Sequence, residues 1–407
     1  MSDLAASAPV RIFLVAGEPS GDLLGARLMR GLADALGPRG RFSGVGGTAM
    51  AGEGLTSLFP ISDIAVMGIG PVLRRLPLIL RRIRETAEAA IATRPDVLVL
   101  IDSPDFCHRV AARVRKARPE QKIVLYVSPT VWAWRPGRAK KIARFTDRLL
   151  ALLPFEPAAH RVLSGPPTDY VGHPFVERVA AVRPEGGRRL PRPGERPVRL
   201  LVLPGSRRSE VTRLMDVFGE VVGRVAAAHP SLEVWIPAVD HVRAEIEARA
   251  GSWAVRPGLL SGEAEKFRAF READAALVAS GTATLELALA GLPMVACYRL
   301  DFIGRMLKHV LDMPKAVRPI VKVRSALLPN LIIGEKAVPE FIDEDCTVDR
   351  VAPALAALLI EGEARDRQIA AFARVDAVMR EGLAETPGAT ATRIVLDVLA
   401  EPALTPR

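Results

Sequence analysis

Two carboxylates follow the apolar run in "LVLIDSPDF" (98–106), where Asp102 comes directly after the run and Asp105 three residues later. A carboxylate at the carboxyl end of a buried strand, in a site closed to water, can accept a proton from a substrate hydroxyl. We therefore expect Asp102 to be a catalytic base. Asp105 fits a capping position in the first turn of a following helix better, although it stays a candidate contact.

A second polar loop, "AGEPSGDLLGA" (16–26), carries Glu18 and Ser20 at its tip. Gly17 and Gly21 permit a tight turn and a close approach of the backbone to a ligand. The loop has no Lys of the P-loop type and does not match a dinucleotide-binding fingerprint. An ordinary strand-to-helix turn and a functional turn both remain open, and the polar tip makes Glu18 and Ser20 candidate catalytic or acceptor contacts.

A third loop, "PGSRRSE" (204–210), has the residues of an anion site. Ser206 and nearby backbone N–H groups can face a phosphate, and Arg207 can bind it through two parallel hydrogen bonds. The alternative is a surface arginine in a turn, which Arg208 fits.

The stretch "SGTATLE" (280–286) places Ser280, Gly281 and Thr282 at the start of an apolar helix, where unpaired N–H groups and the helix dipole favour an anion. Glu286 lies one turn below Thr282 on the same face and fits neither residue as a capping-box acid. We expect phosphates at the helix start and ribose hydroxyls on Glu286. The alternative is a capped connection between two buried strands.

Three further polar features are less specific. Asn330, in the apolar stretch "LPNLI", is either a polar contact to the nucleotide or an Asn turn. The aromatic and basic loop "YVSPTVWAWRPGRAKKIARF" (126–145) suits a sugar phosphate, although its Lys140 and Lys141 fit a solvated helix face. His173 is either a general acid or a structural histidine.

A basic amphipathic helix is expected over residues 66–91. Such a helix can lie on an anionic membrane or admit acyl chains, and it can equally pack on the core with a solvated basic face. The candidate membrane and acyl contacts are Val72, Leu73, Arg74, Arg75, Leu76, Leu80 and Arg81.

These residues must be positioned by an alternation of short apolar runs and helical patterns, which predicts α/β domains with parallel sheets. The expected strands lie within 10–17, 95–102, 122–128, 147–154, 198–206, 232–239, 274–280 and 294–300. Ligands of such sheets bind at the carboxyl ends of the strands, where the polar loops fall.

The alternation is interrupted at residues 183–197, which are rich in Pro, Gly and Arg. We expect an N-terminal domain over 1–182, which contains the basic amphipathic helix, a linker over 183–197, and a C-terminal nucleotide domain over 198–407. The C-terminal helical segment is expected either to cross back or to swap.

Composition narrows the classes of protein. The 56 Lys and Arg residues against 46 Asp and Glu give a net charge of +10, which favours an anionic partner or reflects an Arg-rich genome. Nucleic-acid-binding motifs are absent from the sequence, so no nucleic-acid partner is expected. Cys107, Cys297 and Cys346 are too far apart in sequence for a metal or disulfide pattern. No apolar stretch reaches the ~20 residues of a membrane span, so we expect a cytoplasmic protein, soluble or peripherally attached.

Taken together, the motifs "GEPSGD", "AVMGI", "IDSPDF", "YVSPTVWAWR", "PGSRRSE", "SGTATLE" and "LPNLI" resemble the lipid-A-disaccharide synthases. The resemblance covers roughly residues 11–345, in the family's order. It implies a GT-B glycosyltransferase, with two Rossmann-like domains whose parallel sheets face a central cleft.

The resemblance implies transfer of a diacylglucosamine from its UDP carrier to diacylglucosamine 1-phosphate. Asp102 would be the base, and a UDP site would contain Arg207, Ser280, Gly281, Thr282, Glu286 and Asn330. No metal and no separate cofactor are implied. Peripheral attachment to the anionic inner membrane and a homodimer with exchanged C-terminal segments are implied as well.

The sequence departs from the family pattern at Glu335 and Lys336, where a basic residue followed by an acid is expected, so no role is carried over to either. Two other classes of protein remain as alternatives. One is another GT-B enzyme, such as a UDP-N-acetylglucosamine 2-epimerase or a cell-wall glycosyltransferase, and the other is a non-catalytic nucleotide- or lipid-binding module.

Overall fold

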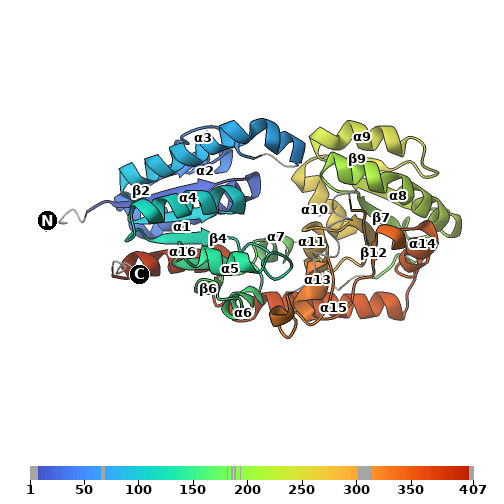
Figure 1. The fold of residues 1–407 in the computed structure, drawn as a ribbon. Helices are drawn as coiled ribbons and strands as arrows, with labels where there is room; N and C mark the ends of the chain where they lie inside the picture. Colours follow the sequence, from blue (N-terminus) through green and yellow to red (C-terminus); the bar gives the residue numbers. More distant parts are fainter. Residues whose placement is uncertain are drawn as a thin grey trace, which may run out of the picture. The chain divides into compact units, whose positions relative to one another are not determined.

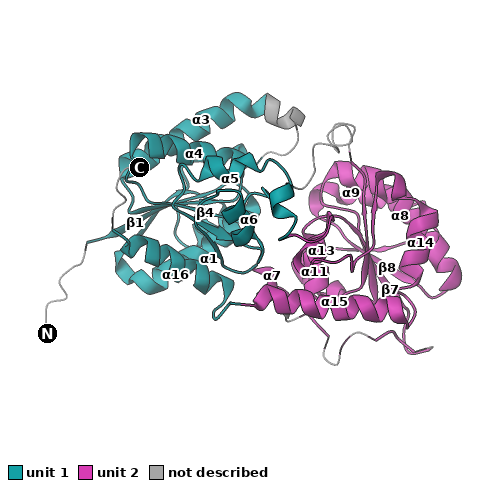
Figure 2. Cartoon of the chain, turned by 60° about the horizontal axis from the view of Figure 1, so that its bottom comes forward, with its two compact units in different colours: residues 1–173, 313–320, 382–407 teal, residues 174–312, 321–381 magenta. Residues whose placement is uncertain are grey.

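The computed structural model describes residues 8–65, 69–180, 182–184, 187, 189–192, 194–300 and 314–402, without the side chains of 69–73 and 180. The chain forms two compact units (Figure 2). Unit 1 comprises Met1–His173, Met313–Ile320 and Gly382–Arg407, and unit 2 comprises Pro174–Asp312 and Val321–Glu381.

Unit 1 contains a six-stranded parallel sheet in the order β2-β1-β3-β4-β5-β6. Its strands are β1 (Val10–Ala16), β2 (Gly40–Val45), β3 (Val97–Ile101), β4 (Ile123–Tyr126), β5 (Arg148–Ala151) and β6 (Thr168–Tyr170). Every residue of β3 and β4 is buried, as expected for central strands covered on both faces.

The helices of unit 1 cover both faces of this sheet. They are α1 (Pro19–Leu36), α2 (Thr48–Gly52), α3 (Ile69–Thr93), α4 (Pro104–Ala117), α5 (Gly137–Ile142), α6 (Glu156–Val162) and α16 (Pro387–Ala400), with short 3₁₀ turns at Gly37–Arg39, Ile61–Asp63 and Lys315–Val317.

Alternate residues of β1 separate two cores in unit 1. Ile12 and Leu14 pack with residues of α1 and α16, whereas Phe13 and Val15 pack with residues of α3 and α4. Figure 1 shows α3 and α16 on opposite sides of the strands. This alternation follows from the two-residue period of a strand.

Unit 2 contains a second six-stranded parallel sheet, in the order β12-β11-β10-β7-β8-β9. Its strands are β7 (Arg199–Leu203), β8 (Glu233–Pro237), β9 (Gly258–Leu260), β10 (Ala275–Ala279), β11 (Met294–Tyr298) and β12 (Glu340–Ile342). Its helices are α7 (Phe175–Ala180), α8 (Arg208–Ala228), α9 (Asp240–Ala250), α10 (Gly262–Glu272), α11 (Ala283–Leu289), α13 (Leu328–Ile333), α14 (Val348–Ala356) and α15 (Glu363–Arg380), with a 3₁₀ turn at Asp343–Asp345.

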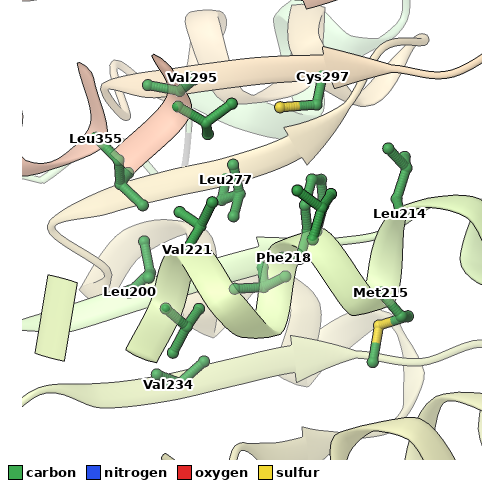
Figure 3. Packing of buried hydrophobic residues seen from close by; sticks show 14 of the residues in the cluster. Leu200, Leu214, Met215, Phe218, Val221, Val234, Leu277, Val295, Cys297 and Leu355 are labelled. Atoms are coloured by element: carbon green, nitrogen blue, oxygen red, sulfur yellow. The ribbon is translucent and has the colours of Figure 1, made fainter. Parts of the chain in front are cut away.

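One face of the second sheet packs on α8, α9 and α14. Figure 3 shows Phe218 and Val221 of α8 among apolar strand residues that include Leu200 and Leu277. This core fixes the strands whose carboxyl ends carry "PGSRRSE" and "SGTATLE".

The expectation of two α/β domains with parallel sheets is confirmed, but the units divide differently from the expected ranges. The division falls between His173 and Pro174, because α7 packs on α11 and α15 of unit 2. The expected linker also belongs to unit 2, where Arg196 binds Asp274 through two 2.7 Å hydrogen bonds.

The C-terminal segment returns to unit 1 instead of completing the second domain. Ala391 and Val395 of α16 belong to the core formed with α1, and the Lys122 ammonium donates to the carbonyls of Leu399 and Glu401. The expected C-terminal domain over 198–407 therefore does not include the last helix.

Candidate functional site

The strand orders mark one position in each sheet where chemistry is expected. In doubly wound sheets, ligands bind outside the carboxyl ends of two adjacent strands whose connections leave in opposite directions. These strands are β1 and β3 in unit 1, and β7 and β10 in unit 2. The polar loops that begin at Gly17, Asp102, Pro204 and Ser280 follow these four strands.

In unit 1, the backbone turns sharply directly after β3. Asp102 and Ser103 have φ values of 58° and 42°, in the left-handed region that costs energy for residues other than glycine. The Asp102 N–H donates to the Tyr126 carbonyl at 2.9 Å, which anchors the turn to β4. Strain of this kind is typical of positions that must aim a side chain.

The Asp102 carboxylate is half-buried and is held by two donors. The Ser20 hydroxyl donates to Oδ2 at 3.0 Å, and the Ser103 N–H donates to Oδ1 at 2.8 Å. The loops can approach because residue 17 is glycine, where a Cβ would lie 2.1 Å from the Ser103 Cβ. The structure therefore brings Ser20 and Asp102 together, as required of an oriented base.

Glu18 and Asp105 have different surroundings. Glu18 is half-buried at the residue before α1, next to this pair in sequence. The Asp105 carboxylate is exposed in the first turn of α4 and lies 3.3 Å from Nη2 of Arg138. Its position fits the helix-start alternative, because a carboxylate there is favoured by the helix dipole.

Asp22, in the loop that carries Glu18 and Ser20, has a structural role. It is buried in α1, and its carboxylate accepts the N–H groups of Gly47, Ala49 and Met50 at 2.7–3.1 Å. It therefore caps α2 and holds the β2–α2 turn, a long-range contact that sequence spacing does not reveal.

The aromatic loop of unit 1 turns largely inward. Trp132 is buried, and its indole N–H donates to Glu156 at 3.1 Å, while the Leu153 N–H donates to the same carboxylate at 3.0 Å. Burial raises the pKa of Glu156 to about 7. Trp134 stays partly exposed, with the Arg135 guanidinium 4.3 Å from its ring centre.

Two histidines beside this loop are buried as well. Ser128 Oγ lies 2.9 Å from Nε2 of His160, and burial lowers the pKa of His160 to about 4. Burial also lowers the pKa of His173 to about 4, which agrees better with a structural histidine than with a charged acid. No sequence pattern singles out Glu156 or His160, since each stands alone in an ordinary helical pattern.

In unit 2, the turn after β7 binds the carboxylate of Glu210 from the same chain. Arg207 is exposed at the residue before α8, and the N–H groups of Ser206 and Arg207 both donate to the Glu210 carboxylate at 3.2 Å. Arg207 Nη1 lies 3.2 Å from the same carboxylate. The turn thus favours an anion as expected, but a ligand phosphate must compete with Glu210. His241, which sequence reasoning missed, lies 2.8 Å from the Ser206 carbonyl through Nε2.

The turn after β10 is exposed at Gly281 and Thr282. The Ser280 N–H continues the ladder by donating to the Cys297 carbonyl at 2.8 Å, and Ser280 Oγ lies 3.4 Å from the Ala326 carbonyl. Glu286 is buried in α11, with Oε2 2.6 Å from the Lys266 ammonium. Lys266, on α10, is a partner that the sequence pattern did not reveal.

The structure gives Asn330 a role different from the expected contact. Its side chain is completely buried, and its amide donates to Ser325 Oγ and the Val338 carbonyl while its oxygen accepts the Val338 N–H. Ser325 also donates to Glu340, which accepts the Ala326 N–H. Asn330 lies within α13, not in the Asn turn of the alternative, and it fixes the segment that Ser280 contacts. Its side chain has no exposed surface in this structure.

Helix α3 packs on the core at one end and exposes basic and apolar side chains at the other. Its second half packs on the core through Ile83, Ala87 and Ala90. Its first half exposes Leu76 and Leu80, at 37 % and 40 %, beside exposed Arg74, Arg75 and Arg81. The side chains of the remaining candidates, Val72 and Leu73, lie outside the described part of the structure.

Two features are absent from the described residues. No helix there is both long and apolar enough to cross a bilayer. No group of three or more His, Cys, Asp or Glu side chains there is arranged to hold a metal ion.

Glu335 and Lys336 are exposed, and Glu335 forms an ion pair with Arg374.

The sequence profile of the lipid-A-disaccharide synthetase family matches residues 12–393. The chain belongs to this family. A lipid-A-disaccharide synthase of Rhodopseudomonas palustris strain HaA2 is 51% identical over 389 residues, which cover 96% of each chain. The lipid-A-disaccharide synthase of Rhodospirillum centenum is 44% identical, over 96% of this chain and 95% of the relative. The resemblance read from the seven motifs is thereby confirmed.

Solved structures of other proteins have a similar fold at much lower sequence identity to this chain. UDP-GlcNAc 2-epimerase from Neisseria meningitidis superposes with a TM-score of 0.57 at 10% identity, over 97% of this chain and all of that one. MurG of Acinetobacter baumannii gives 0.54 at 13% identity, over 96% and 99%. The expected GT-B type of fold is thereby confirmed, while the epimerase alternative gains no support beyond the fold.

Proposed function

We propose that this chain condenses UDP-2,3-diacylglucosamine with 2,3-diacylglucosamine 1-phosphate, giving a β-1,6-linked disaccharide 1-phosphate and UDP. The family match over residues 12–393 carries the proposal. The arrangement of Ser20 and Asp102 at the carboxyl edge of the first sheet supports it. We assign the acceptor to unit 1 and the donor nucleotide to unit 2.

The proposed reaction is a single inverting displacement with Asp102 as the base. The acceptor's 6-hydroxyl oxygen attacks the anomeric carbon of the donor, and its proton passes to the Asp102 carboxylate. Ser20 and the Ser103 N–H hold that carboxylate in one orientation, so the proton acceptor needs no rearrangement during the step.

As the new bond forms, the bond from the anomeric carbon to the UDP oxygen breaks, and the electron pair leaves with UDP. We assign to Arg207 and the Ser280–Thr282 turn the stabilisation of the negative charge that develops on UDP. Glu286 is assigned to the ribose hydroxyls, held in place by Lys266. Ser206 is assigned to the diphosphate through its exposed hydroxyl. Asn330 is assigned a positioning role.

In this assignment, protein groups stabilise the negative charge of the leaving group. We therefore propose that neither a metal nor another cofactor is required. Full activity after treatment with a chelator agrees with the proposal. An activity lost in EDTA and restored by Mg²⁺ contradicts it.

The test of the activity is a mass measurement of products after incubation of the protein with both acylated sugars. A disaccharide 1-phosphate together with UDP supports the proposal. A rearranged UDP-sugar indicates an epimerase, and unchanged substrates indicate a binding module. The Asp102→Asn variant, tested in parallel, shows whether any product depends on the assigned base.

We further propose that the first half of α3 attaches the protein to an anionic membrane surface, such as the inner membrane. Adjacent exposed arginines and leucines give this segment both charge and apolar area, and both of the proposed substrates carry acyl chains. Replacing Arg74, Arg75 and Arg81 by Gln should weaken binding to anionic vesicles.

A charge-matched control for this triple variant lies on the neighbouring helix α4, where Arg109, Arg113 and Lys116 are exposed. Their replacement by Gln should reduce vesicle binding less. Equal losses would assign the binding to net charge alone, and unchanged sedimentation of the α3 variant would leave α3 as a core-packing helix.

A homodimer by exchange of C-terminal segments is the remaining proposal. It is supported by the way α16 docks on α1 through Ile394, Val395 and other apolar residues, because α16 of a second copy could occupy the same surface. Sedimentation equilibrium tests it, and a monomer at micromolar concentration contradicts it.

A further inference from the structure

The loop between β4 and α5 has no part in the proposed reaction, although it carries aromatic and basic side chains. Trp134 is 36 % exposed, and its indole N–H donates to Thr130 Oγ1 at 3.0 Å. The Arg135 guanidinium lies over this ring, 4.3 Å from its centre, and the Arg138 guanidinium lies 5.7 Å from the same centre. One aromatic ring, held by its own hydrogen bond, therefore supports two guanidinium groups.

This arrangement leaves the hydrogen-bonding edges of both guanidinium groups accessible. Stacking on a ring uses the face of a guanidinium, whereas its N–H groups lie in the plane. Arg135 is exposed, and no hydrogen bond or ion pair joins its side chain to the described part of the chain. Arg138 Nη2 lies 3.3 Å from Asp105, whose side chain is 83 % exposed. Because an ion pair so exposed contributes little, a ligand oxyanion can replace that carboxylate.

The backbone holds this loop in a strained conformation. Arg135 has a φ of 51°, in the left-handed region that costs energy for a residue with a Cβ and that persists only where the surroundings hold it. The Trp134 N–H donates to the Thr130 carbonyl at 3.2 Å, and the Arg138 N–H donates to the Arg135 carbonyl at 2.9 Å. These bonds on either side of Arg135 fix both arginines relative to Trp134 before any ligand binds.

The charges described beside this loop favour an anion. His108 of α4 packs against the Phe145 ring. Burial, and next the charge of Arg138, lower the pKa of His108 to about 4. Asp105 acts in the opposite direction but less strongly than Arg138, and Lys141 acts in the same direction as Arg138. The positive charge therefore prevails at His108, even though Asp105 contacts Arg138.

The loop also lies close to the proposed base. Arg138 contacts Asp105, which follows Asp102 by three residues, so the Cα atoms of the two aspartates are within about 11 Å of each other. The Asp102 N–H donates to the carbonyl of Tyr126, the last residue of β4, from which the loop leaves. In a hexosamine 1-phosphate, the 6-hydroxyl group and the phosphate are carried on the two sides of the ring oxygen. One such sugar could present its hydroxyl to Asp102 and its phosphate to the two arginines.

We propose that Arg135 and Arg138, supported by Trp134, bind the 1-phosphate of the acceptor and thereby select a phosphorylated acceptor. This inference rests on the proposed function, from which it takes the acceptor. The planar N–H pairs of arginine match the oxygens of a phosphate. Binding at the phosphate fixes one side of the sugar and orients the 6-hydroxyl on the other side toward Asp102.

The test is a steady-state comparison of two acceptors, 2,3-diacylglucosamine 1-phosphate and the same sugar without its phosphate. The parent should use the phosphorylated acceptor at least tenfold better in kcat/KM. Arg135→Gln combined with Arg138→Gln should reduce this preference to less than about threefold. The variant should raise KM for the phosphorylated acceptor at least tenfold and change KM for the UDP-sugar less than twofold. If the double variant does not fold, Arg135→Gln alone decides, with an expected loss of preference of at least threefold.

Lys140→Gln combined with Arg144→Gln is the charge-matched control. Both side chains are exposed, and Lys140 lies two residues after Arg138, so the two do not share a face of α5. This control should keep the parent's preference. Equal losses in the two variants would assign the effect to net charge and overturn the site. A parent without a preference, or a rise in KM confined to the UDP-sugar, would overturn it as well.

A binding measurement tests the site without glycosyl transfer. Glucosamine 1-phosphate is titrated with the full chain in excess UDP, and its phosphorus resonance is followed by NMR. A shift with the parent and the control that is lost in the arginine double variant supports the phosphate site, even if the parent forms no disaccharide. No shift with the parent overturns the site, even if the disaccharide is formed. Failure of this inference is therefore distinguishable from failure of the proposed function.

Discussion

Replacement of Glu286 by alanine tests whether this carboxylate binds the nucleotide or only supports the fold. The Glu286 side chain is 6 % exposed and accepts a 2.6 Å hydrogen bond from Lys266, whose side chain is 30 % exposed. The Lys266 ammonium also lies 5.2 Å from the ring centre of Phe270. The carboxylate thus has a fixed orientation in the absence of any ligand.

The variant should affect both folding and UDP binding, by different amounts. A charge-assisted hydrogen bond contributes about 1.5–3 kcal/mol, and the Lys266 ammonium left behind can still reach water. The free energy of unfolding should therefore fall by about 2 kcal/mol. Two lost hydrogen bonds from ribose should cost about 2–3 kcal/mol of binding, or roughly 30- to 150-fold in the dissociation constant of UDP.

The assay is calorimetric titration with UDP and with 2′-deoxy-UDP, together with chemical denaturation. The parent should prefer UDP, and Glu286→Ala should lose that preference. Lys266→Met is the control, because it breaks the same ion pair but retains the carboxylate, so it should keep the preference for UDP. If Glu286→Ala keeps the preference, or if both variants weaken UDP binding equally, Glu286 serves only as the partner of Lys266.

Three further predictions concern unit 1. Asp102→Asn should lower kcat by about 10²- to 10⁴-fold and change UDP affinity less than twofold; near-normal turnover in a steady-state assay would assign the base elsewhere. Gly17→Ala should lower the unfolding free energy by about 1–3 kcal/mol in denaturant titrations and reduce activity, because its Cβ would meet Ser103; a neutral result would show that the loops can separate. The raised pKa of Glu156 contributes stability that is complete below about 4.5 and lost as the pH rises through about 7. Melting curves should therefore show Glu156→Gln gaining stability relative to the parent from pH 5 to pH 8, and a constant difference would contradict this.

The central strands of both sheets could be predicted from the sequence, because residues covered on both faces form uninterrupted apolar runs. The runs at 10–17, 95–102 and 274–280 became β1, β3 and β10. The strands without a prediction were β2, β6, β9 and β12, which are the two edges of each sheet. An edge strand is partly exposed, as in "TDY" of β6, so it has no apolar signature.

The loops of the candidate site could be predicted for the same reason, since each follows a recognisable central strand. The partners of their side chains could not. Lys266 pairs with Glu286 across 20 residues, and Asp22 caps a helix that begins 26 residues later. Such pairs depend on how helices pack on the sheet, which local spacing does not record.

Asn330 and Glu210 show why residue type alone does not separate a ligand from a scaffold. A buried amide that organises the Ser325–Val338 loop and an amide that binds a nucleotide both require polar chemistry in an apolar context, so the sequence signal is the same. Glu210 shows the converse, because its carboxylate binds the N–H groups that the motif offers to a phosphate. The motif therefore marks a turn whose N–H groups bind a carboxylate of the same chain, and a ligand phosphate must displace Glu210 to bind there.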